Sequence, residues 1–231
     1  MQRTISAMVG KGSVNHNSRK FRAENVDGTR THLNIDYCNE NIKTVYHELF
    51  DEALERYNAK QTRSDRKIKD YYEKIRSSKQ EKPFREIILQ VGGKGNMNAD
   101  TENGELAKQV LDEYYQGFQE RNPQLRVFSA HLHMDEATPH LHIDFVPFTT
   151  GSKRGLDTRV SLKQALATQG FKGGSRGDTE WSQWVQSEKE QLAAVMERYG
   201  IEWEHKGTHE KHLSVLDLSL IHISEPTRLG M

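Results

Sequence analysis

The segment 131–142 constrains this chain more than any other part of its sequence. It reads His-Leu-His-Met-Asp-Glu-Ala-Thr-Pro-His-Leu-His, so two histidine-apolar-histidine units flank an acidic pair and a proline. Side chains alternate across a β-strand, so the histidines of each unit share one face and the apolar residues share the other. We therefore predict a hairpin with strands over 125–134 and 140–148, with histidines on one face and an apolar layer on the other.

The clustering of imidazoles on one face predicts a metal site. A single histidine in a strand is usually a surface or core residue. Four imidazoles brought together by a hairpin have little structural value, and they repel one another when protonated. Neutral imidazoles, with or without a carboxylate, bind divalent metal ions and leave coordination positions open. The candidates are His131, His133, His140 and His142.

Hydrophobic periodicity over the rest of the chain predicts an α+β fold. Two further strands are expected over 4–9 and 84–91, and helices over 42–60, 65–78, 105–121 and 179–199. This order favours an antiparallel sheet with helices packed on one face, and the other face free for ligands.

Three motifs along the chain resemble those of the MobV (Mob/Pre) plasmid mobilisation relaxases, which belong to the His-hydrophobe-His endonuclease group. The first motif is Asn15-His16-Asn17-Ser18-Arg19, the second is His32-Leu33-Asn34, and the third is His133-x-Asp135-Glu136 followed by Pro139-His140-x-His142. The resemblance covers roughly 4–150 and implies a relaxase palm. In that palm, His133, His140 and His142 would hold the metal ion, whereas His131 lies outside the family pattern.

Membership of this family implies a defined reaction. Such enzymes nick one DNA strand at a plasmid transfer origin by transesterification and stay joined to the 5′ phosphate. The resemblance implies His16 as nucleophile, Arg19 as a phosphate clamp, and Mn²⁺ or Mg²⁺ as the metal, with Zn²⁺ as an alternative. Glu136 would either hold the tautomer of His16 or act as a fourth metal ligand. Tyr37 and Tyr46 remain open as alternative nucleophiles.

The charge distribution indicates where DNA would bind. The chain has 33 basic and 33 acidic residues, yet 60–79 and 151–177 each carry a net charge of +5. The second segment places its cations among six glycines, which suits a mobile loop over a phosphate backbone directly after the metal-binding strand. The predicted DNA-binding residues are His32, Asn34, Lys153, Arg154, Arg159, Lys172 and Arg176. Packing is an equally good role for His32 and Asn34, and Trp181 and Trp184 could stack on bases or anchor their helix.

The remaining expectations concern compartment and chain ends. One cysteine, Cys38, and no apolar run long enough to cross a bilayer predict a cytoplasmic protein without a membrane segment in this fragment. Residues 1–217 are expected to form a relaxase domain truncated at its carboxyl end. Residues 218–231 resemble a translated sequencing adapter and are expected to be non-native. The family resemblance also implies a homodimer formed through a missing carboxyl-terminal region.

Two other functions fit the same residues. A metal-dependent phosphoesterase or other hydrolase would use the three histidines, with Glu136 activating water. A non-catalytic DNA-binding module would use the metal only for stability.

Overall fold

The computed structural model describes residues 1–10 and 12–205, so the suspected adapter segment lies outside the described residues. The strands are β1 (Gln2–Arg3), β2 (Ile5–Val9), β3 (Ile35–Asn39), β4 (Arg85–Val91), β5 (Leu125–His133), β6 (His140–Thr149), β7 (Arg159–Val160) and β8 (Glu202–Trp203). The α-helices are α1 (Val14–Asn17), α2 (Ile42–Ala59), α3 (Tyr71–Arg76), α4 (Glu102–Gln116), α5 (Phe118–Arg121), α6 (Leu162–Thr168) and α7 (Glu180–Arg198); 3-10 turns cover Thr31–Leu33 and Ser64–Arg66. Among these residues, no helix is long and apolar enough to cross a membrane.

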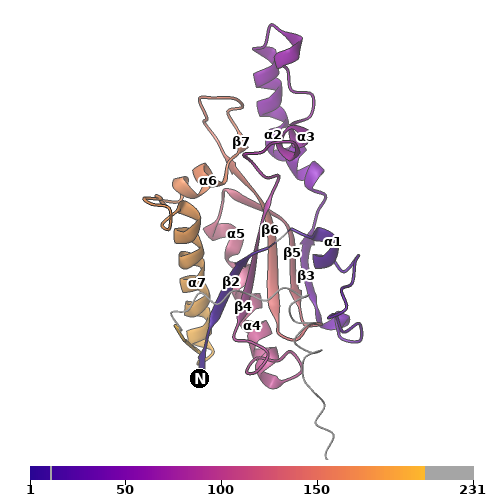
Figure 1. The fold of residues 1–231 in the computed structure, drawn as a ribbon, viewed down its shortest axis with the longest axis vertical. Coiled ribbons are helices and arrows are strands. Elements are labelled where there is room, and N and C mark those ends of the chain that lie inside the picture. The colour runs from indigo at the N-terminus through magenta and orange to yellow at the C-terminus, as the bar shows by residue number, and fades with distance from the viewer. Residues whose placement is uncertain (11, 206–231) are drawn as a thin grey trace, which may run out of the picture.

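A six-stranded antiparallel sheet forms the centre of the molecule, which confirms the predicted α+β class (Figure 1). Its strands lie in the order β2-β4-β6-β5-β3, and β7 adds to the far end of β6. The hairpin of β5 and β6 is central and places its histidines on one face, as the sequence predicted. In its register, Leu132 lies opposite Leu141 and His133 lies opposite His140. The histidines therefore lie on two strands that each have a neighbouring strand on both sides.

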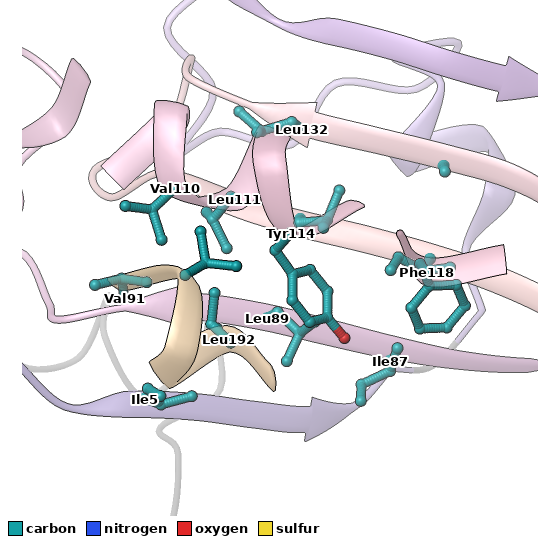
Figure 2. Close-up of a cluster of buried hydrophobic side chains, with 14 of the residues drawn as sticks. Ile5, Ile87, Leu89, Val91, Val110, Leu111, Tyr114, Phe118, Leu132 and Leu192 are labelled. Carbon is teal, nitrogen blue, oxygen red and sulfur yellow. The ribbon is translucent and has the colours of Figure 1, made fainter. Parts of the chain in front are cut away.

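The main hydrophobic core lies on the face opposite the histidines, between the sheet and helices α4, α5, α6 and α7 (Figure 2). Alternate residues of β4, namely Ile87, Leu89 and Val91, point into it and are fully buried. Leu132 and Leu141 enter the same core from the hairpin. This apolar layer fixes the register, because a slip of one residue would exchange the core face for the histidine face.

A second core lies on the histidine side, at the end of the sheet away from the hairpin turn. There α2 and α3 pack over Phe128 and Val146, which face away from the main core. The sequence predicted that this face would be free for ligands, and at this end that prediction is wrong. The sheet face that stays available for a site is the part near the hairpin turn.

Several predicted helices differ at their ends. The helix predicted over 65–78 is only Tyr71–Arg76, because the Asp70 side chain accepts the backbone N–H of Glu73 and caps the helix there. The helix predicted over 105–121 begins at Glu102, after the Thr101 cap, and breaks at Gly117 into α4 and α5. Strand β3 was not predicted, because its five residues do not alternate regularly between apolar and polar side chains and a register shift falls between Asp36 and Cys38.

The glycine-rich segment 151–177 is more ordered than predicted. It contains β7 and α6, and Ala165 and Leu166 of α6 are fully buried. It also lies at the opposite end of β6 from the histidines: β7 pairs with Phe148 and Thr149, and the ten residues of β6 span about 30 Å. The segment therefore follows the metal-binding strand, as expected, but it begins at the end of that strand away from the histidines.

Candidate metal centre and nucleophile

Three of the four hairpin histidines converge. Each of His133, His140 and His142 offers one ring nitrogen to a common point, and these atoms lie within 4.8 Å of one another. The centroids of their rings are 4.7–5.2 Å apart. Strand pairing explains this, because His133 lies directly opposite His140 and His142 follows on the same face.

The outer nitrogen of each ring is held by a different acceptor. His133 Nε2 lies 2.8 Å from the carbonyl oxygen of Asn17, and His140 Nδ1 lies 2.8 Å from that of Thr138. His142 Nδ1 lies 2.7 Å from Oε1 of Glu86. Each contact places the ring proton on the outer nitrogen, so the three inner nitrogens carry lone pairs that face one another.

This donor set fits a divalent metal ion. Nε2 of His142 is buried and has no hydrogen-bond partner in the part of the chain that the structure describes. Burial and the neighbouring imidazole of His140 lower the pKa of His142 to about 4. Burial and the other two histidines lower the pKa of His133 still further below its usual range. Both rings are therefore neutral at physiological pH, which metal binding requires.

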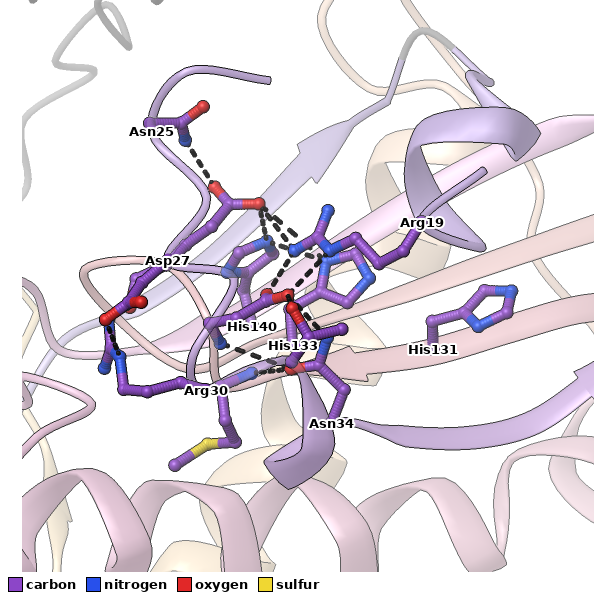
Figure 3. A network of polar contacts seen from close by, with 12 residues as sticks. Arg19, Asn25, Asp27, Arg30, Asn34, His131, His133 and His140 are labelled. Atoms are coloured by element: carbon purple, nitrogen blue, oxygen red, sulfur yellow. Dashed lines mark hydrogen bonds and ion pairs between the residues drawn. The ribbon is translucent and has the colours of Figure 1, made fainter. Parts of the chain in front are cut away.

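His131 shares the histidine face but stands apart from this cluster (Figure 3). Its Nδ1 lies 2.5 Å from Asp36 Oδ1 on β3, and its ring is stacked 6.3 Å from that of His133. The face therefore carries four imidazoles, as the strand pattern predicted, and only the three of the family motif converge.

His16 lies beside the three histidines. It sits on the four-residue helix α1, with its ring centroid 6.1 Å from that of His133 and 6.2 Å from that of His142. Its Nε2 lies 3.5 Å from Oε1 of Glu136. The same carboxylate oxygen lies 3.9 Å from Nδ1 of His133 and 3.7 Å from Nε2 of His140. Glu136 therefore borders both His16 and the metal cluster, so its position suits both roles suggested by the sequence.

Arg19 is held by carboxylates and does not point freely toward a ligand (Figure 3). Its Nε and NH2 donate to the two oxygens of Asp135 at 2.9 and 2.5 Å, and NH2 also donates to Glu136 at 2.9 Å. NH1 donates to the carbonyl oxygen of His16 at 3.2 Å. The Arg19 backbone has φ of 56°, an uncommon conformation for a non-glycine residue. The geometry thus places Arg19 between the hairpin turn and α1.

Asp135 is the centre of this polar network and was not assigned a role from the sequence. It is fully buried and accepts hydrogen bonds from Thr31 and Asn34 as well as from Arg19. Burial raises its pKa, but Arg19 and the amide of Asn34 outweigh that and lower the pKa, so it is ionised. Asn34 also accepts the backbone N–H of Met134. Its amide is thereby used in packing, one of the two roles that the sequence allowed.

A second buried network behind the histidines was also missed. The Asn17 side chain donates to Glu86 at 2.7 Å and to Asp144 at 3.0 Å, and Ser129 donates to Asp144 as well. Gly10 lies so close to Glu86 that a Cβ there would fall 1.7 Å from its carboxylate oxygen. The available signal was Glu86 itself, a charged residue one position before the apolar centre of its strand.

The alternative tyrosine nucleophiles lie elsewhere. The hydroxyl of Tyr37 donates to Asp112 on α4 at 2.7 Å, and that of Tyr46 donates to the carbonyl oxygen of Pro83 at 2.7 Å in the second core. Burial raises the pKa of both hydroxyls.

Trp184 is fully buried and donates to Asn122, so it anchors α7. Trp181 packs on Trp184 at a ring distance of 4.8 Å.

The other predicted DNA-binding residues do not border the metal cluster as one group. His32 is near the site, with Nδ1 2.9 Å from the carbonyl oxygen of Thr29. Arg154 and Arg159 line a hollow of about 240 Å³ at the far end of the sheet, together with Lys74 of α3. Lys172 contacts Gln183 of α7 through its backbone. Among residues 1–10 and 12–205, no hydrogen bond or ion pair of the Lys153 or Arg176 side chain assigns it a role.

Comparison with known proteins agrees with the fold and the motifs. The Mob_Pre family model, described as plasmid recombination enzyme, matches residues 12–209. Plasmid recombination enzyme type 3 proteins from Staphylococcus aureus and Mammaliicoccus lentus are 27% identical over 157 residues, which is 66% of this chain and 33% of theirs. This chain therefore spans about a third of the length of these curated relatives.

Solved structures of similar fold include the MobM relaxase domain (MOBV; Mob_Pre) bound to plasmid pMV158 oriT DNA, in Mn-bound crystals. Two of them match with TM-scores of 0.55 and 0.53 and 20% sequence identity, covering 94% of this chain and 99% of theirs. At that identity the likeness establishes the fold. Since the family model matches most of the chain, this protein belongs to the Mob_Pre family of plasmid recombination enzymes.

Proposed function

We propose that this chain is a relaxase domain that cuts and rejoins one strand of plasmid DNA at a transfer origin. The observation that carries the proposal is the position of His16, which lies against Glu136 and within about 6 Å, ring to ring, of two histidines of the metal cluster. The names of the relatives and the oriT DNA bound by MobM support the same activity.

His133, His140 and His142 would hold a divalent ion, for which Mn²⁺ has the support of the Mn-bound MobM crystals. When bound, the ion would polarise the scissile phosphate and offset the charge that develops on its oxygens. The chain itself supplies the orientation. Asn17, Thr138 and Glu86 hold the outer ring nitrogens, so the inner lone pairs are aimed before the ion arrives.

His16 would act as the nucleophile. An unprotonated ring nitrogen attacks the phosphorus, a P–N bond forms, and the P–O3′ bond breaks. The remaining ring proton passes to the departing 3′ oxygen, so the products are a phosphoramidate between His16 and the 5′ phosphate of the downstream strand, and a free 3′ hydroxyl on the upstream strand. Glu136 lies close enough to His16 Nε2 to carry this proton. Because the P–N bond retains the energy of the broken ester, the reverse attack by the 3′ hydroxyl reseals the strand.

Arg19 would position this nucleophile. Its fork is occupied by Asp135 and Glu136, and its NH1 lies 3.4 Å from His16 Nε2. A planar guanidinium can bond two carboxylates at once, and it can thereby fix the start of the loop after α1 relative to the hairpin turn. A phosphate contact through NH1 is compatible with this role.

The cationic residues would bind DNA away from the cut. Lys74, Arg154 and Arg159 come from the two +5 segments, which the fold brings together around one hollow at the end of β6 away from the histidines. Within the described residues none of the three forms an ion pair with a carboxylate. They would therefore be available to phosphates of the flanking origin DNA. His32, Lys153, Lys172 and Arg176 remain predicted DNA contacts, and we place the reaction in the cytoplasm because its substrate is plasmid DNA.

Adduct formation tests the proposal. The protein is incubated with Mn²⁺ and single-stranded DNA labelled at its 3′ end, using both the 22-nucleotide oriT strand bound by MobM and a pool of random sequences. We expect a labelled protein adduct that survives denaturation, hydrolyses in mild acid, and is lost in His16→Ala. His47→Ala, which removes an exposed histidine of α2, is the matched control and should retain the adduct chemistry.

Other outcomes would identify the competing functions. Turnover to free 5′ ends without an adduct would indicate a hydrolase in which Glu136 activates water. An acid-stable adduct would contradict His16 as nucleophile. Unchanged behaviour of His16→Ala, together with unfolding on chelation of the metal, would indicate a DNA-binding module with a structural ion.

A further inference from the structure

Three exposed residues follow the His16 motif directly. They are Lys20, Phe21 and Arg22, and they lie in the loop after α1. Phe21 has 61% of its surface exposed, and it is the one aromatic residue among the strongly exposed large hydrophobic side chains in the described part of the chain. Neither Lys20 nor Arg22 has a carboxylate within ion-pair distance among the described residues. Neither core of the protein contains the Phe21 ring, and within the described part of the chain no carboxylate pairs with either cation.

The backbone holds these residues at a fixed position beside His16. The N–H of Phe21 donates to the carbonyl oxygen of Asn15 at 2.9 Å, which folds the loop back onto α1. Arg19, which precedes the tripeptide, has a left-handed backbone and is tied to Asp135 through two hydrogen bonds. An exposed aromatic ring on a pinned turn loses little conformational entropy when a ligand stacks on it.

The chemistry of the tripeptide matches single-stranded nucleic acid. Such strands present phosphates and unpaired bases in alternation, and proteins bind them with cations along the backbone and aromatic rings against the bases. A duplex buries its base faces, so an exposed ring gains stacking only from an unpaired strand. The order cation, aromatic, cation beside the nucleophile therefore favours single-stranded DNA over any apolar partner.

We propose that Lys20, Phe21 and Arg22 form a subsite for the single strand next to the scissile phosphate. Phe21 stacks on one unpaired base, and the two cations contact neighbouring phosphates. The subsite rests on the proposed function for its substrate, and it adds a residue that would select an unpaired strand and hold the nucleotide next to the cut.

Equilibrium binding in the metal-free state tests this subsite without cleavage. Fluorescence anisotropy is measured with the labelled 22-nucleotide oriT strand and with oligo-dT of the same length. Phe21→Ala should raise Kd about 5- to 100-fold, while Phe21→Trp should keep it near the wild-type value. Lys20→Gln and Arg22→Gln should each reduce the slope of log affinity against log salt by about 0.7. Val9→Ala, which truncates another exposed hydrophobic residue with 60% exposure, is the matched control and should change nothing.

A second readout locates the contact. With 2-aminopurine placed at successive positions of the strand, wild-type protein should quench one position most, and Phe21→Ala should abolish that quenching while the melting temperature stays unchanged. A Kd for Phe21→Ala within twofold of the wild type, or an equal loss on duplex DNA, would overturn the subsite. If the wild-type protein forms no adduct yet binding depends on Phe21, the subsite stands and the proposed relaxase reaction fails.

Discussion

Replacing Glu86 with glutamine should weaken metal binding without touching a metal ligand. The Glu86 side chain is 2% exposed, and its oxygens accept three hydrogen bonds of 2.7 Å, from His142 Nδ1, Asn17 Nδ2 and the Gly12 backbone. Burial alone would raise its pKa, but the contact with His142 and the other donors outweighs burial and lowers it. Glu86 is therefore an ionised acceptor for all three groups.

Glutamine cannot replace it, because an amide offers one oxygen and one NH2 group. With the amide oxygen toward His142 and Asn17, its NH2 faces the N–H of Gly12. In the flipped orientation, the NH2 faces Nδ1 of His142 and moves the ring proton to Nε2, the atom that would bind the metal. Loss of such an outer partner typically costs 10- to 100-fold in metal affinity, which is about 1.4–2.8 kcal/mol.

Titration of the metal-free protein with Mn²⁺ by isothermal calorimetry measures this effect. Glu113→Gln is the matched control, since Glu113 forms an exposed ion pair with Arg198 on the other side of the molecule. Thermal melting with chelator checks that Glu86→Gln is folded. A folded Glu86→Gln protein with wild-type Mn²⁺ affinity would refute the argument that Glu86 fixes the tautomer of His142.

Three further predictions concern the networks around the site. Asp144→Asn should flatten the pH dependence of the unfolding free energy in metal-free protein. Burial and Glu86 raise the pKa of Asp144 from 3.8 to about 7. The contribution of Asp144 to the unfolding free energy is therefore full below pH 4 and is lost as the pH rises through 7. Urea unfolding should show the wild type losing roughly 2–3 kcal/mol between pH 5 and 8 through this group, and an equal loss in the variant would contradict the assignment. Arg19→Lys keeps the charge but cannot hold both carboxylates, so single-turnover adduct formation should slow roughly 10- to 100-fold, and an unchanged rate would remove Arg19 from positioning. Trp184→Phe leaves the buried oxygen of Asn122 without its donor, so unfolding free energy should fall by about 1–3 kcal/mol while Mn²⁺ affinity stays constant; a fall in both would show that α7 supports the site.

The sequence predicted the parts of the fold that depend on local pattern. The strands over 125–134 and 140–148 and the long helices α2 and α7 follow from periodicities that each segment carries by itself. Strand β3 was missed because its five residues carry no regular alternation of apolar and polar side chains. Segment 151–177 was expected to be a loop because it is rich in glycine. The seven-residue helix α6 within it was missed, since its burial depends on residues distant in sequence.

The candidate site divides in the same way. His133, His140 and His142 could be assigned from the sequence, because alternation on a hairpin is enough to place them on one face. Glu86, Asn17 and Asp135 could not, since their roles arise from contacts between segments separated by up to 127 residues. The sequence placed Arg19 correctly beside His16 but could not show that its guanidinium is already occupied.

By itself, the sequence determined the chemistry that is available: three imidazoles, a carboxylate, and a histidine with an arginine three residues later. The tertiary structure decided which nitrogen of each ring carries the lone pair, where His16 lies, and that the two basic segments meet at the end of the sheet away from the histidines. The physical reason is that alternation acts between neighbours in the chain. Tautomers, buried ion pairs and charged surfaces depend on groups that only folding brings into contact.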